Sequence, residues 1–188
     1  GKALTFAHGR GEHLQYADLY LIRPDGSGLK RIGDRGQFCG SPKWSADSAR
    51  LVAYCMDVQR TLETRRVSPN PGNDTRIVSI AIATGGVAEI AAGPGVKFNP
   101  AFISGDDVGY LRKASSEPGV YYTSGASGPR GQVRAASWSP DGSRIVFAAC
   151  LLAAVTNRAC VDLFIADEDG RNVTPPLVHT PDFMSAPV

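Results

Sequence analysis

Two aspartates of the chain, Asp47 and Asp141, stand in similar surroundings and could be taken for a pair of catalytic carboxylates. Each belongs to the pattern Trp-Ser-x-Asp, and each is followed by a short apolar run. An aspartate in a tight turn accepts hydrogen bonds from neighbouring backbone amides. We therefore expect both side chains to stabilise turns and to take no part in catalysis.

The three histidines, His8, His13 and His179, are scattered along the chain, and no Cys-x-x-Cys pair accompanies them. Because metal ligands must converge on one point, we expect neither a metal nor another cofactor. The chain also lacks the motifs G-x-S-x-G and H-E-x-x-H and the phosphate-binding P-loop. We therefore predict that the protein is not an enzyme.

The four cysteines have a spacing that predicts two disulfides. Cys39 lies eight residues before Asp47 and Cys55 eight residues after it, so the two would face each other across antiparallel strands. Cys150 ends one expected strand and Cys160 begins the next. We predict the bridges Cys39–Cys55 and Cys150–Cys160, hence an oxidising compartment. Four buried free thiols are the alternative.

A repeated pattern positions all of these residues. A Trp-Ser pair, a turn at Asp and an apolar strand occur at 43–53 and 137–147, and in degenerate form at 100–110, where Phe102 replaces the tryptophan. A strand closed by a turn that carries Gly follows at 18–26, 76–90 and 162–170. Such units of four short strands bury little alone, so they must stack on one another.

These repeats resemble the TolB-like, or PD40, repeat of the WD40-like β-propellers. The fullest match spans 138–173 and contains Ser-Pro-Asp-Gly, Asp-Leu-Phe-Ile and a closing Asp-Gly. The resemblance implies an all-β propeller of four-stranded antiparallel blades. Members of this family are mostly extracytoplasmic bacterial proteins, which serve as docking platforms or as propellers attached to hydrolases.

We expect a single propeller domain over residues 1–188, with about four blades. They are predicted at 2–33 completed by 183–188, at 38–92, at 96–128 and at 132–178. Either the C-terminal strand completes the first blade and closes a four-bladed ring, or the chain is part of a larger propeller, six blades being usual in the family. The last motif stops within a strand, which favours the second arrangement.

Charge and hydropathy limit the partners. The formal net charge is only +2, which argues against nucleic acid, and no apolar run reaches the roughly 18 residues of a membrane span. We predict a periplasmic or secreted module that binds a protein, with further blades or another chain as additional partners. A propeller that binds a ligand or glycan and belongs to a hydrolase or lyase is the alternative.

The loops between the second and third strands of the blades are the expected binding surface, because they are long and irregular. The segment 57–74 is predicted to be a mobile insertion whose arginines bind an acidic protein surface; a merely solvated loop is the alternative. The candidate binding residues are Arg10, His13, Arg60, Arg65 and Arg66.

Overall fold

The computed structural model describes residues 3–10, 16–57, 74–113, 115–149, 161–175 and 177–180. These residues form fifteen strands and no helix, which confirms the all-β prediction. The strands are β1 (Leu4–Arg10), β2 (Tyr16–Ile22), β3 (Lys30–Ile32), β4 (Gln37–Trp44), β5 (Arg50–Asp57), β6 (Arg76–Ala81), β7 (Val87–Ala91), β8 (Val96–Ser104), β9 (Asp107–Lys113), β10 (Gly119–Tyr122), β11 (Ser127–Arg130), β12 (Val133–Trp138), β13 (Arg144–Ala149), β14 (Val161–Asp167) and β15 (Val178–Thr180).

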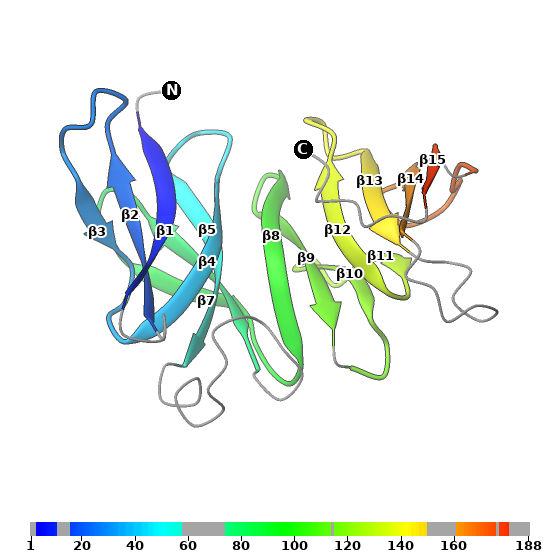
Figure 1. Ribbon diagram of the computed structural model, residues 1–188, viewed down its shortest axis with the longest axis horizontal. Coiled ribbons are helices and arrows are strands. Elements are labelled where there is room, and N and C mark those ends of the chain that lie inside the picture. Colours follow the sequence, from blue (N-terminus) through cyan, green and yellow to red (C-terminus); the bar gives the residue numbers. More distant parts are fainter. Residues whose placement is uncertain are drawn as a thin grey trace. The chain divides into compact units, whose positions relative to one another are not determined.

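Strands that follow each other along the chain form consecutive sets, which we call blades (Figure 1). The first blade is β1–β3, and the others are β4–β7, β8–β11 and β12–β15. A single parallel bridge between Ala17 and Phe38 joins the first two blades into one seven-stranded sheet. The number of blades and their closure into a ring stay predictions, and residues 183–188 lie outside the described part of the chain.

The chain divides into two compact units, residues 1–102 and 103–188, and the boundary falls within β8. In unit 1 the apolar core gathers around Leu19, Leu51 and Ile80. Strand β5 is buried on both faces, since Leu51, Val52 and Ala53 are all inaccessible to solvent. This explains why its sequence is a continuous apolar run without polar alternation.

The core of unit 2 contains two stacked phenylalanines, Phe147 of β13 and Phe164 of β14, whose ring centroids are 5.4 Å apart. They lie directly opposite each other in the β13–β14 ladder. The repeat tryptophan Trp138 donates a hydrogen bond from Nε1 to Tyr122 Oη at 3.0 Å. Tyr122 Oη in turn donates to the carbonyl oxygen of Glu168 at 2.7 Å, which links the last two blades.

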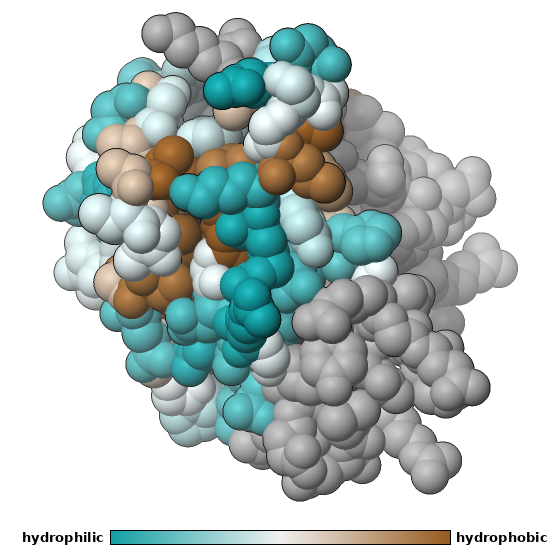
Figure 2. All heavy atoms as spheres, turned by 90° about the vertical axis from the view of Figure 1, so that its left-hand side faces the viewer, coloured by the Kyte–Doolittle hydropathy of each residue, from teal (hydrophilic) through white to brown (hydrophobic). Residues whose placement is uncertain are grey.

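The first blade leaves apolar side chains at the surface, as Figure 2 shows from the side on which β1–β3 lie. Leu4 is 57% exposed and Phe6 37%, although Phe6 stacks on Tyr20 of β2. The described residues contain no helix that is long and apolar enough to cross a membrane.

The turn aspartates have the structural role that the repeat predicts. Asp47 Oδ1 accepts hydrogen bonds from Ser45 Oγ at 2.6 Å and from the backbone amide of Ala49 at 3.0 Å. Asp141 Oδ1 accepts from the hydroxyl of Ser139 at 2.5 Å and from the amide of Ser143 at 3.1 Å. Both carboxylates are thus occupied within their own turns.

One of the two predicted disulfides is present. Cys39 and Cys55 are directly paired residues of β4 and β5, and their sulfur atoms are bonded at 2.03 Å. Cys150 and Cys160 lie outside the described residues, so their bridge stays a prediction. Mass spectrometry of an unreduced digest checks it: a peptide pair joined through these two cysteines is expected, and free thiols would contradict it.

Candidate functional site

The binding residues expected from the sequence lie mostly where the structure gives no description. His13, Arg60, Arg65 and Arg66 fall outside the described residues. Arg10 ends β1, where its backbone pairs with Tyr16, but its side chain is also outside the described part. The loop surface built from these five residues therefore stays a prediction.

Each blade has two ends, and in unit 2 they differ in charge. We letter the four strands of a blade A to D in chain order. At the B–C end, strand B leads to strand C, and strand D leads to the next blade. Arg112 and Lys113 close β9 at this end, Arg130 closes β11, and Arg134 stands near the start of β12. We call these four residues the basic end of unit 2.

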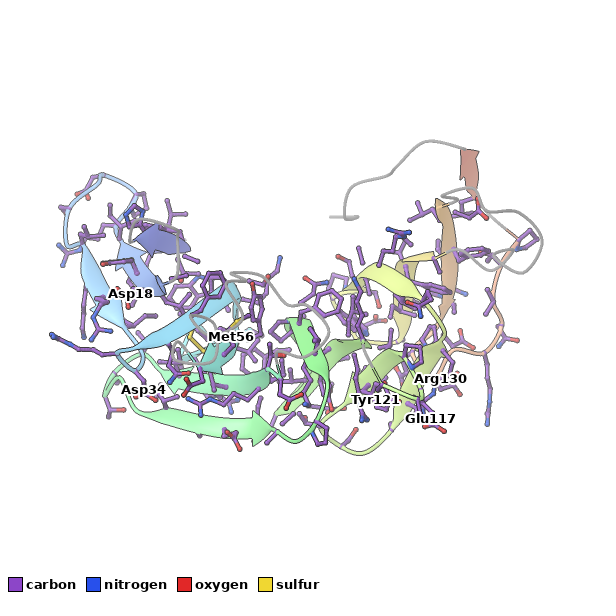
Figure 3. All side chains as sticks on the ribbon, turned by 60° about the horizontal axis from the view of Figure 1, so that its bottom comes forward. Asp18, Asp34, Met56, Glu117, Tyr121 and Arg130 are labelled. Carbon is purple, nitrogen blue, oxygen red and sulfur yellow. A yellow bond between two sulfur atoms is a disulfide. The ribbon has the colours of Figure 1, made fainter. Side chains whose placement is uncertain are left out.

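At the basic end, two arginines lie against one tyrosine ring. The guanidinium carbon of Arg130 is 4.4 Å from the centroid of the Tyr121 ring, and that of Arg112 is 5.3 Å from it. Tyr110 stacks on Tyr121 with the centroids 6.1 Å apart. Figure 3 shows Tyr121 and Arg130 close to Glu117, whose carbonyl oxygen accepts a hydrogen bond from Tyr121 Oη at 2.6 Å.

Strand register places the two arginines on either side of β10, opposite the same residue. Gly119 of β10 pairs with Arg112 on one side and with Arg130 on the other. The β10–β11 register shifts between Gly119 and Tyr121, an irregularity of the kind that re-aims side chains. Gly119 has a φ of 148°, and a Cβ there would lie 2.6 Å from the carbonyl oxygen of Pro129, so glycine is required for the close approach of β11.

The hydrogen-bonding capacity of these arginines is only partly used. Nη2 of Arg130 donates to Ser127 Oγ at 2.6 Å. Nε of Arg112 is buried and has no hydrogen-bond partner among the described residues. No acidic side chain in the described part of the chain forms an ion pair with either arginine. Arg112 and Arg130 therefore carry positive charge with which no described carboxylate forms an ion pair.

The arginine charges also act on two neighbouring titratable groups, after burial, which is the larger cause in both. Burial lowers the pKa of Lys113, and the charge of Arg134 lowers this pKa further. Burial raises the pKa of Tyr110, while the positive charge of Arg112 opposes that rise. A ligand that suits this surface would therefore carry negative charge.

The opposite end of unit 2, with the A–B and C–D turns, is acidic. A hollow of about 380 Å³ opens there, and its lining includes Asp107, Asp141, Glu168 and Asp169. Burial raises the pKa of Asp107, but hydrogen bonds from Ser124 and Thr123 outweigh this effect and leave the pKa below its ordinary value. No three metal-ligating side chains cluster anywhere in the described ranges.

Unit 1 contains a much smaller cavity beside the disulfide. Its volume of about 10 Å³ is close to the space that one water molecule needs. The lining includes Asp18, Gln37 and Arg76, and Figure 3 shows Asp18 and Asp34 in this part of unit 1. Asp18 lies 3.7 Å from a guanidinium nitrogen of Arg31, so its carboxylate takes part in an ion pair within the first blade.

The arginine–tyrosine cluster was not predicted, although the repeat carries a signal for it. Counted back from the turn after the third strand, Arg112 occupies the position that Ala53 and Phe147 occupy in two other blades. Both of those residues are buried and apolar. A charge at a position that is elsewhere apolar could have marked the site.

Comparison with solved structures finds the same fold in other proteins. A TolB-like protein from Agrobacterium tumefaciens superposes with a TM-score of 0.66 at 18% identity, covering 93% of this chain and 61% of its own. An oligogalacturonate lyase in complex with manganese gives a TM-score of 0.54 at 15% identity, covering 80% of this chain and 47% of its own. No family model matches the sequence, and no curated protein matches it significantly.

These similarities establish the fold alone. The chain has a TolB-like β-propeller fold and spans about three fifths of the first of these proteins and about half of the second. One neighbour is a lyase and the other is TolB-like, so the fold is shared by proteins with different functions.

Proposed function

We propose that this chain is an extracytoplasmic binding module that recognises an acidic protein surface through the B–C end of its blades. The observation that carries the proposal is the basic end of unit 2. There, Arg112 and Arg130 lie at strand ends and have no acidic partner in the described part of the chain. Sites on strands are held more rigidly than sites on loops.

The composition and shape of this surface favour a protein partner. Arginine and tyrosine are the residues that protein interfaces enrich at their energetic centres. Small-molecule sites, in contrast, are usually concave. Neither of the two cavities described above includes Arg112, Tyr121 or Arg130 in its lining.

The disulfide supports the extracytoplasmic part of the proposal. Disulfides persist in oxidising compartments and are rare in the cytosol of most organisms. Cys39–Cys55 is buried between β4 and β5. A periplasmic or secreted location also agrees with the TolB-like repeats. We further propose that the chain is not itself an enzyme and binds no nucleic acid.

A second candidate is glycan binding, which the likeness to an oligogalacturonate lyase favours. The basic end of unit 2 could bind the carboxylates of a sugar acid as well as those of a protein. The two candidates differ in the ligand that is bound, so one experiment can compare them.

The experiment measures binding of poly-L-glutamate, oligogalacturonate, double-stranded DNA and poly-L-lysine by calorimetry at physiological salt. We expect poly-L-glutamate to bind and the other three not to bind. The quadruple variant R112Q/K113Q/R130Q/R134Q should abolish binding. The control K30Q/R35Q/K43Q/R144Q removes four exposed cations elsewhere and should retain most of it. Equal losses in both variants, or tight binding of DNA, would contradict the proposal.

A further inference from the structure

We propose that Arg112 and Arg130, stacked on Tyr121, form a clamp for one carboxylate of an acidic protein segment. The inference rests on the proposed function and names the chemistry of its central contact. It separates these two arginines from the other two cations of the basic end, Lys113 and Arg134, which would act only through their charge.

Stacking leaves the donors that a carboxylate needs. A guanidinium is planar: it contacts an aromatic ring through its face and donates hydrogen bonds from its edge. Arg130 and Arg112 lie 4.4 and 5.3 Å from the Tyr121 centroid, so the ring holds both groups. Among the described residues, Ser127 alone accepts a side-chain hydrogen bond from Arg130. The remaining N–H groups can donate to both oxygens of a carboxylate.

Several contacts fix the ring that supports the clamp. Tyr121 Oη is tied to the Glu117 carbonyl, and Tyr110 stacks beside it in the neighbouring strand. Gly119, which pairs with both arginines, has no side chain to separate them. The arginines are therefore ordered before a ligand arrives, which reduces the entropy lost on binding.

Electrostatics also favours an anion at this point. Two guanidinium groups against one ring repel each other, and no described carboxylate forms an ion pair with either of them. A carboxylate bound by both groups would offset the repulsion and accept hydrogen bonds from their exposed N–H donors.

The test separates the planar donor geometry of the two guanidinium groups from their positive charge. R112K/R130K keeps both positive charges but loses the planar donors, whereas K113Q/R134Q loses two charges and keeps both arginines. The probe is a hexaglutamate peptide, and binding is measured by calorimetry and by the salt dependence of the association rate. We expect R112K/R130K to weaken binding about tenfold or more. K113Q/R134Q should mainly slow association and flatten its salt dependence.

The possible negative results contradict different parts of the proposal. If R112K/R130K binds hexaglutamate as well as the wild type does, the clamp is wrong while the proposed function stands. If the folded wild type binds neither hexaglutamate nor poly-L-glutamate, the proposed function fails first. Arginine-dependent binding of inorganic phosphate or oligogalacturonate, without binding of hexaglutamate, would overturn the assignment to a protein carboxylate. Unchanged circular dichroism and melting of each variant establish that the fold is retained.

Discussion

The two ends of unit 2 carry opposite charges and use them in opposite ways. At the turn end, Asp107 and Asp141 each accept several hydrogen bonds from hydroxyls and backbone amides close by. At the basic end, Arg112 and Arg130 stack on Tyr121 and make few hydrogen bonds to the described residues. The two aspartates at the turn end stabilise the fold, whereas Arg112 and Arg130 keep donors that the described residues do not use.

Negative charge and a hollow do not by themselves make the turn end a binding site. The larger hollow lies at the acidic end, yet its turn carboxylates already have their partners. The arginines line neither cavity but retain donors for a ligand. Substitutions at the turn end should therefore reduce stability and spare binding, while substitutions at the basic end should do the reverse.

The largest loss of stability is expected from Tyr122→Phe, beneath the turn end. Tyr122 is buried, and burial raises its pKa to about 12. Removing its hydroxyl deprives Trp138 Nε1 and the Glu168 carbonyl of their partner, which costs about 2–3 kcal/mol of unfolding free energy. Urea denaturation measures this. Tyr121→Phe, at the adjacent but more exposed residue, is the control and should change stability by less than about 0.5 kcal/mol.

A smaller loss is expected from Asp107→Ala. The carboxylate accepts hydrogen bonds from Thr123 Oγ1, Ser124 N and Ser124 Oγ, all at 2.8 Å, and so ties the A–B turn to the C–D turn. Because the site is partly exposed, water replaces some of these bonds, and we expect a loss of about 1–2 kcal/mol. Glu168→Ala removes another carboxylate of the same hollow and should be nearly neutral. Equal losses in both variants would contradict the distinction.

Much of the fold could be predicted from the sequence because its signals are local. The turn roles of Asp47 and Asp141 and the bridge Cys39–Cys55 follow from repeat spacing and strand alternation, and the structure confirms all three. The contact of Arg112 and Arg130 with one ring depends on two strand registers and an irregularity beside Gly119. Sequence spacing does not reveal these features, least of all in the most degenerate repeat.

The basic end should respond differently to mutation. R112Q/R130Q removes two positive charges with which no described acid forms an ion pair, so the relief of repulsion offsets the lost contacts with Tyr121. We expect the unfolding free energy to change by no more than about 0.5 kcal/mol while hexaglutamate binding is lost. A loss of stability as large as that of Tyr122→Phe would mean that the arginines are structural.

The smallest effect concerns the titration of Asp141. Hydrogen bonds from Ser139 and Ser143 lower its pKa from 3.8 to about 2. A lowered pKa means that these bonds favour the charged form: their contribution is complete above pH 3.8 and is lost as the pH falls through about 2. In S139A/S143A the midpoint, followed by carboxyl carbon NMR, should rise towards 3.8, while Asp47, held by Ser45 and Ala49, keeps its lowered pKa. An unchanged Asp141 midpoint would show that its local hydrogen bonds do not occupy the carboxylate, and the contrast between the two ends would lose its basis.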